Sequence, residues 1–210
     1  MSDAEIYDAR LEMVDFAIEA FWDVPEEQFV ENLLGPGAQF PEDSVTDRLD
    51  EGFGLLRSWI AENRDRPVAD VRDDLEREYT DLFVGPRPPV LPHETYYRDD
   101  TDFIGEGLAD VEASYGGAGW APPEDYPEEN DFVAVELAFL RHLIERQRAG
   151  HEEAFGFERV FLDEHLLVWH DDLVADVREK ADSDFYLAAA LVFSGLVTFE
   201  DELVAQQVPG

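Results

Sequence analysis

The chain has 210 residues, no cysteine, and 51 acidic against 15 basic side chains, so its formal net charge is -36. This excludes disulfides and thiolate metal sites, and it argues against a nucleic-acid partner because phosphate binding requires clustered Lys and Arg. The acids are spread along a chain that is 45% hydrophobic and contains one lysine, Lys180, which indicates a folded protein adapted to a cytoplasm of very high salt.

Helical periodicity dominates the chain, and no segment alternates apolar and polar residues as a strand would. We therefore predict an all-α fold: one domain over residues 1–210, built as a bundle of about eight helices. The first residues, "MSDAEIYDAR", lack the basic and apolar regions of a signal peptide, which favours a cytoplasmic protein. The expected helices cover residues 3–22, 26–34, 44–63, 67–84, 101–115, 131–149, 157–180 and 183–206.

Several of these helices have suitable residues at their starts. We expect Ser44 to cap the third helix with Asp47 reaching back to it, Pro67 to occupy a first turn, and Ser183 to cap the last helix. The last helix contains the longest uncharged run, "FYLAAALVFSGLVTF", which is shorter than the roughly 20 residues that span a bilayer. It predicts a buried central helix and no membrane insertion.

Two loops interrupt the helices, one rich in proline near 85–100 and one near 116–130, "GGAGWAPPEDYPEEN". The proline-rich loop is suited to act as a hinge, so the protein is expected to be a monomer or a domain-swapped dimer. Tyr96, Tyr97, Trp120 and Tyr126 lie in these loops. They either grip a basic, partly apolar peptide or cover the end of the bundle.

Glu136 interrupts the apolar stripe of the 131–149 helix, which consists of Phe132, Phe139, Leu140 and Leu143. A glutamate on an apolar face is costly to bury unless it is paired. It either pairs internally with an arginine or is held at a groove to receive a cation from a partner, and the sequence favours neither.

The sequence contains no convincing catalytic constellation. His165 and His170 are five residues apart and point in different directions, so structural histidines beside surface acids are favoured over a metal-dependent enzyme that uses the 165–172 cluster. No serine stands in a nucleophile context, and "GGAG" lacks the residues of a phosphate-binding loop. We predict no enzyme, no metal and no cofactor.

In the stretch "EYTDLFVGPRPPVLPHETYY" (78–97), Leu-Phe, Gly-Pro and a proline-rich loop precede an acid and aromatics. This stretch resembles the first signature of the TorD/DmsD-type chaperones, a family related to NarJ, and two further stretches resemble signatures of the same family. "PEENDFVAVELAFL" resembles a Glu-x-x-Asp-His element, with Glu128 and Asp131 in register and Phe132 in place of the histidine. "FLDEHLLVWHDDLVADVREKADSDFY" (161–186) resembles the family's third motif, and the resemblance covers residues 68–206.

This resemblance implies an all-α chaperone without catalysis that binds the twin-arginine leader of a molybdoenzyme catalytic-subunit precursor. The client would be a molybdopterin-containing oxidoreductase of the DMSO/TMAO reductase family, held until its cofactor is inserted. The alternative is an accessory or scaffold subunit that binds the folded enzyme.

The leader is expected to bind between the two loops. Arginine acceptors would be Glu128, Asp131 and Glu136, and Asp131 would act without an imidazole because Phe132 replaces the histidine. At about 1 M salt the Debye length is roughly 3 Å, so recognition must rest on short bidentate contacts and apolar burial. The predicted leader-binding residues are Tyr79, Phe83, Gly85, Pro86, Pro92, Glu94, Tyr97, Trp120, Glu128, Asp131, Phe132 and Glu136.

Overall fold

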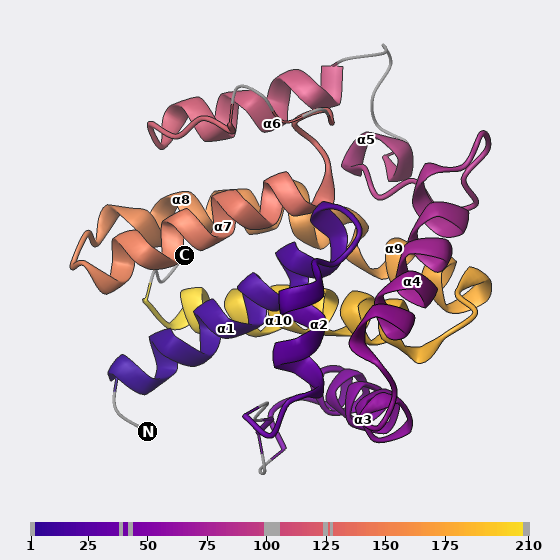
Figure 1. The fold of residues 1–210 in the computed structure, drawn as a ribbon. Helices are drawn as coiled ribbons and strands as arrows, with labels where there is room; N and C mark the ends of the chain where they lie inside the picture. The colour runs from indigo at the N-terminus through magenta and orange to yellow at the C-terminus, as the bar shows by residue number, and fades with distance from the viewer. Residues whose placement is uncertain are drawn as a thin grey trace.

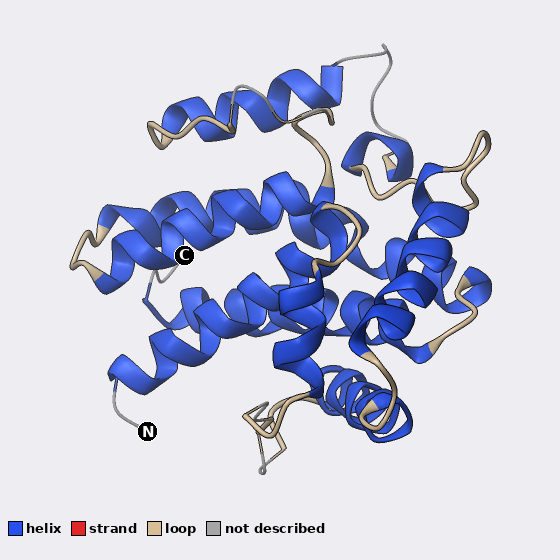
Figure 2. Ribbon diagram, viewed as in Figure 1, coloured by secondary structure: helices blue, strands red, loops and turns tan. Residues whose placement is uncertain are grey.

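The computed structural model describes residues 3–37, 40–41, 44–98, 106–123, 126 and 128–207, and this part of the chain is helical without a β-strand (Figures 1 and 2). Two π-helical segments, η1 and η2, continue or join α-helices. The elements are α1 (Asp3–Trp22), α2 (Glu27–Leu34), α3 (Asp47–Asn63), α4 (Val68–Tyr79), η1 (Thr80–Val84), α5 (Glu94–Tyr97), α6 (Glu106–Gly117), α7 (Val133–Arg148), α8 (Glu153–Phe161), η2 (Leu162–Leu166), α9 (Leu167–Lys180) and α10 (Asp184–Gln207).

The predicted all-α fold is confirmed. Because η1 extends α4 and η2 fuses α8 to α9, the described residues form eight helices of at least seven residues and the single turn α5. The α8–α9 helix begins at Glu153, one turn before the predicted start at 157. Residues 101–105 of the predicted 101–115 helix lie outside the described residues, and α6 is described from Glu106.

The observed N-cap of α10 is the residue that the sequence predicts, whereas the observed N-cap of α3 is a different residue. Ser183 Oγ accepts a hydrogen bond from Phe185 N at 3.3 Å, as predicted. At α3 the prediction was wrong, because Thr46 Oγ1 caps the helix by accepting from Leu49 N at 3.2 Å. Ser44 lies too far upstream to cap the helix and instead donates to the Asp50 carboxylate.

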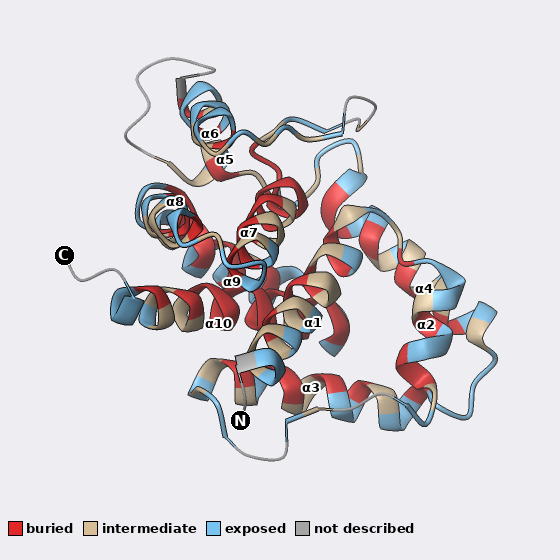
Figure 3. Ribbon diagram, turned by 90° about the vertical axis from the view of Figure 1, so that its left-hand side faces the viewer, coloured by how far each residue is buried: buried red, intermediate tan, exposed pale blue. Residues whose placement is uncertain are grey.

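Helix α10 is the buried centre of the bundle, as its uncharged run predicts, and Figure 3 shows buried residues along most of its length. Its small residues let α3 approach closely. A Cβ added at Gly195 would stand 2.7 Å from Leu49 Cγ, and one at Gly52 would stand 3.1 Å from Leu191 Cβ. The α3–α10 contact therefore requires glycine at both positions. None of the helices in the described part of the chain is long and apolar enough to cross a membrane.

A buried polar group joins α1, α7, α8 and α10, and we call it the Arg10 cluster: Arg10, Gln147, Glu158 and Glu200. Arg10 donates to both oxygens of Glu200, with Nη2 2.6 Å from Oε2 and Nε 2.9 Å from Oε1. Arg10 Nη2 also donates to Gln147 Oε1 at 2.9 Å and lies 3.4 Å from Glu158 Oε1. Gln147 in turn donates to Glu158. The cluster fixes α1 against the three other helices, because every buried charge in it has a partner.

Candidate partner-binding site

The two loops meet at the start of α7. Val133 N donates to Pro92 O at 2.9 Å, Glu94 N donates to Asp131 O at 3.0 Å, and His93 and Phe132 form an isolated antiparallel bridge. The proline-rich loop therefore lies beside the second, acidic loop, as the sequence predicts. Residues 99–100, 124–125 and 127 of the two loops lie outside the described residues.

The first loop contains the helical turn α5, which the sequence prediction of a loop over 85–100 missed. A single turn is not stable by itself. Here the carboxylate of Asp131, from another segment, caps one N–H group of the turn: Asp131 Oδ2 accepts from Thr95 N at 3.2 Å and also from Thr95 Oγ1 at 2.5 Å. The helix thus depends on a residue that is distant in sequence, so local sequence gave no signal for it.

Asp131 has an imidazole beside it, although Phe132 replaces the histidine of the family's motif. His93 Nδ1 lies 3.0 Å from Asp131 Oδ1, and the His93 ring centroid lies 5.2 Å from that of Phe132. The expectation that Asp131 acts without an imidazole was therefore wrong. Burial opposes ionisation of Asp131, but the hydrogen bonds from His93 and Thr95 outweigh it and hold the pKa of Asp131 below its ordinary value.

Glu94 and Glu136 lie together in the interior beneath this junction, and we call them the acid pair. Both are fully buried. Glu94 accepts from Arg98 Nη1 at 2.5 Å, and its Oε2 lies 3.0 Å from His165 Nδ1. Glu136 accepts from Trp169 Nε1 at 3.4 Å through Oε2, whereas its Oε1 has no hydrogen-bond donor among the described residues.

The pKa of Glu136 is raised well above its ordinary value, first by burial and then by the charge of Glu94 and a hydrogen bond shared with it. Burial and the neighbouring carboxyl group therefore favour the neutral form of Glu136. Both sequence interpretations of Glu136 need correction. It does not pair with an arginine in the described structure, and it does not face an open groove.

The remaining predicted site residues divide by exposure. Tyr79, Phe83 and Pro92 are buried; Tyr79 donates its hydroxyl to Phe21 O at 3.0 Å, and Phe83 packs in the same aromatic core. Gly85, Tyr97 and Trp120 are half-buried, and Pro86 and Glu128 are exposed.

The aromatic side chains that remain partly accessible pack on the same part of the bundle as the acid pair. Tyr97 stacks on Trp169 with ring centroids 5.6 Å apart, and its hydroxyl donates to Asp176 at 3.0 Å. Trp120 packs on Tyr115 at 4.9 Å. Tyr96, which the sequence placed in the loop but not in the site, is 57% exposed. These rings cover this part of the bundle, and Tyr96 is the most accessible of them.

The two histidines of the 165–172 cluster have internal partners, as the sequence favoured. His165 belongs to η2, and its ring lies between Glu94 and Ser114, with Nε2 2.9 Å from Ser114 Oγ. His170 Nδ1 lies 2.6 Å from Ser194 Oγ. The described residues contain no group of three or more His, Asp or Glu side chains placed to hold a metal ion.

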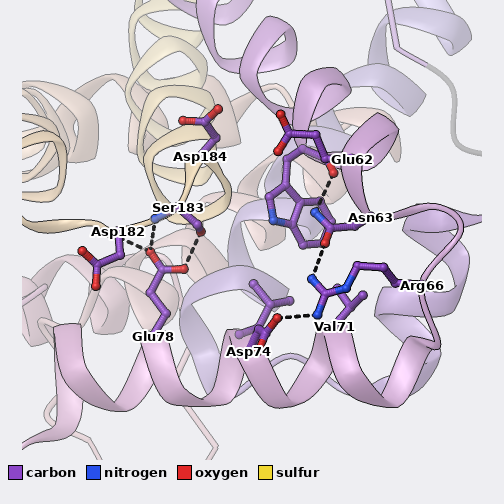
Figure 4. Close-up of a pocket in the computed structure, with 11 residues that line it drawn as sticks. Glu62, Asn63, Arg66, Val71, Asp74, Glu78, Asp182, Ser183 and Asp184 are labelled. Atoms are coloured by element: carbon purple, nitrogen blue, oxygen red, sulfur yellow. Dashed lines mark hydrogen bonds and ion pairs between the residues drawn. The ribbon is translucent and has the colours of Figure 1, made fainter.

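A separate cleft of about 370 Å³ lies between α3, α4 and the start of α10, and sequence reasoning did not predict it (Figure 4). Trp59 and Leu75 are among its apolar residues. Its polar groups are engaged with one another: Arg66 donates to Asp74 at 2.6 Å, and the Glu78 carboxylate accepts from Ser183 N at 2.7 Å. The acid pair, His93 and Asp131 do not line this cleft.

The described residues form a helical protein. Its candidate partner-binding site is the place where the two loops are hydrogen-bonded to each other above buried carboxyl groups. The model of the family described as Nitrate reductase delta subunit matches residues 46–175, more than half of the chain, so the chain belongs to this family. The resemblance to TorD- and NarJ-type proteins is thereby confirmed.

Two curated relatives are each named Chaperone protein TorD. The one from Vibrio atlanticus (strain LGP32) is 28% identical over 114 residues, which cover 51% of this chain and 53% of the relative. The one from Vibrio cholerae serotype O1 is 27% identical over 113 residues, which cover 51% of each protein. The chain thus spans about half the length of the curated relatives it matches. No solved structure matches it.

Proposed function

We propose that the protein is a cytoplasmic maturation chaperone that binds the twin-arginine leader of a molybdopterin-containing oxidoreductase precursor until the cofactor is inserted. The family match and the two relatives named as TorD chaperones support this function. The single observation that carries the site is the junction of the two loops, where His93 and Asp131 come together above buried carboxyl groups.

Binding requires an accessible rim as well as buried groups. Tyr96 is 57% exposed, the Glu128 side chain is 48% exposed, and Tyr97 and Trp120 are half-buried. In this proposal the aromatic rings contact the apolar part of the leader, and Glu128 pairs with an arginine at the surface. Because concentrated salt removes long-range attraction, these contacts must be short, and bidentate pairing favours arginine over lysine.

The proposal treats residues 1–210 as one chaperone domain without catalytic activity. The hydrophobic core supports this view, because one cluster of buried side chains includes residues from Val14 to Val204. The client is proposed to belong to the DMSO/TMAO reductase family.

A titration of labelled synthetic leader in concentrated KCl, followed by fluorescence anisotropy, tests this function. The Arg-Arg peptide is expected to bind at least about tenfold more tightly than the Lys-Lys peptide or a scrambled sequence. Glu128→Gln is expected to weaken binding, whereas Glu202→Gln, an exposed acid on α10, serves as the matched control. Equal binding of the three peptides would contradict the proposal.

Purification of the tagged protein from its host, followed by identification of the proteins recovered with it, distinguishes a chaperone from an accessory subunit. A chaperone is expected to recover the precursor with its leader and without cofactor. Recovery of the mature, cofactor-loaded enzyme in fixed stoichiometry would instead identify an accessory or scaffold subunit.

A further inference from the structure

Helix α6 lies on the outside of the bundle and is linked to Glu94 of the acid pair through His165. Figure 1 shows it as an outer helix above α7 and α8, and only Gly107, Val111 and Tyr115 are buried among its described side chains. These residues are four apart, so α6 contacts the bundle along a single narrow stripe. Helix α7, in contrast, buries ten of its sixteen residues.

Two neighbouring residues of α6 contact the polar interior. Ser114 Oγ lies 2.9 Å from His165 Nε2, and His165 in turn contacts Glu94. Tyr115 donates its hydroxyl to Asn130 O at 2.7 Å. Burial, and then the charges of Glu136, Glu94 and Asp131, raise the pKa of Tyr115.

Glu136 lacks a cationic partner. Arg98 and His165 both contact Glu94, whereas Glu136 receives only the indole N–H of Trp169, and its Oε1 has no donor in the described part of the chain. A fully buried oxygen without a donor is rare in folded proteins. Two buried carboxyl groups side by side, one with an unused oxygen, are suited to a ligand with several fixed donors and a positive charge.

We propose that the acid pair is an internal binding site for one guanidinium group of the leader, and that α6 is a cover that moves aside to admit it. This inference rests on the proposed function, since the leader is the source of the arginine. When the guanidinium binds, the Glu136 proton leaves to solvent, and the planar fork donates to Glu136 Oε1 and to Glu94. Arginine fits better than lysine because its five N–H donors extend across both carboxyl groups.

The Ser114, His165 and Glu94 side chains follow the order of a hydrolase triad, but they are better explained as the latch of α6. Ser114 belongs to a regular helix, where the backbone N–H groups are used within the helix. Stabilisation of an oxyanion requires free donors beside the nucleophile. The Ser114–His165 hydrogen bond therefore holds the cover in place.

The first test is the affinity of the Arg-Arg leader peptide for variants of the full chain. Glu136→Gln keeps the shape but cannot become a carboxylate when the guanidinium binds, so it is expected to lower affinity at least about tenfold. Glu158→Gln is the matched control, because Glu158 is as deeply buried and also has a raised pKa but lies in the Arg10 cluster. It is expected to change affinity by less than about twofold. An equal effect of both substitutions would overturn the inference.

Ser114→Ala tests the cover without altering the acid pair. Loss of the latch is expected to raise affinity for the leader by about two- to fivefold, because a closed state that cannot bind becomes less populated. Unchanged or weaker binding would count against α6 as a cover.

The movement of α6 is measured with spin labels, which the absence of native cysteine makes simple. Cysteines replace Ala113 on α6 and Ala175 on α9, both exposed. The interspin distance is expected to change when the Arg-Arg peptide binds and to stay constant with the Lys-Lys peptide. If the Arg-Arg peptide binds fully and the interspin distance does not change, the inference is overturned and the proposed function is unaffected. Failure of the wild-type protein to bind any leader rejects the proposed function, and the inference with it.

Discussion

The Arg10 cluster and the acid pair are two buried polar regions of the same bundle, and they differ in how their charge is balanced. In the Arg10 cluster one guanidinium contacts Glu200, Glu158 and Gln147. In the acid pair, Glu94 contacts Arg98 and His165, but Glu136 has no cationic neighbour among the described residues. The first region is complete within the chain, while the second has an acceptor left over.

This difference indicates different roles. A buried charge network that is fully paired fixes the arrangement of the helices that contribute to it. A buried acid with one oxygen unpaired and no cation beside it is costly to ionise, so its neutral form is favoured. The arginine that completes the first region comes from α1, whereas in our proposal the second receives its arginine from a partner.

The largest expected loss of stability follows from a substitution in the Arg10 cluster. Arg10→Ala leaves the buried Glu200 without its cation, so the free energy of unfolding is expected to fall by about 3–5 kcal/mol. Urea denaturation in concentrated KCl measures this loss. Arg141→Ala, which breaks a partly exposed pair with Asp15, is the control and is expected to cost less than about 1 kcal/mol. A similar small loss for both variants would show that the Arg10 cluster does not hold α1.

The second effect concerns the loop junction above the acid pair. His93→Ala removes a hydrogen-bond partner of the buried Asp131, and the free energy of unfolding is expected to fall by about 1–3 kcal/mol. Hydrogen exchange of Thr95 N should accelerate as well, because this N–H is bonded to the same carboxylate. His151→Ala, on the exposed loop before α8, is the control. Unchanged exchange at Thr95 would contradict this account of α5.

The third effect is a dependence of stability on pH that follows from the raised pKa of Glu136. The folded-state pKa of Glu136 is raised above its ordinary value of 4.5, so the folded state holds this proton after the unfolded chain has lost it. Its contribution to stability is therefore complete at low pH and is lost as the pH rises above about 4.5.

Glu136→Gln is neutral at every pH and avoids this loss. The variant is expected to gain stability relative to the wild-type protein by up to about 1.4 kcal/mol per pH unit above that point. Urea denaturation between pH 5 and pH 8 measures the difference. Glu145→Gln, on the exposed part of α7, controls for the loss of a surface charge. A constant difference between Glu136→Gln and wild type over this range would be inconsistent with a neutral buried acid.

The smallest expected change in stability tests the hydrogen bonds by which Asp131 caps α5. Thr95→Val removes the hydroxyl that donates to Asp131 Oδ2 but keeps the backbone N–H bond, so stability is expected to fall by about 0.5–1.5 kcal/mol. Thr198→Val is the control, since its hydroxyl donates to a carbonyl within α10. If Thr95→Val and Thr198→Val lower the free energy of unfolding equally, the hydrogen bond to Asp131 would contribute no more than a hydrogen bond within a helix.

Much of the candidate site could be anticipated from motifs, because the sequence indicated that the proline-rich loop lies beside the second loop. Three features could not be anticipated. His93 precedes Asp131 by 38 residues, so no local pattern shows that its ring lies beside the Asp131 carboxylate. The turn α5 exists only through a cap from another segment, and Ser114 meets His165 across 51 residues.

The sequence by itself determined the all-α class, the buried central helix and most helix positions, because apolar spacing and caps act over a few residues. It also identified Glu136 as an acid on an apolar face. Only the tertiary structure decided that the neighbour of Glu136 is Glu94 and not an arginine, and that Ser114 of α6 reaches Glu94 through His165. The partners of a buried charge come from distant segments, and the folded chain alone brings them together.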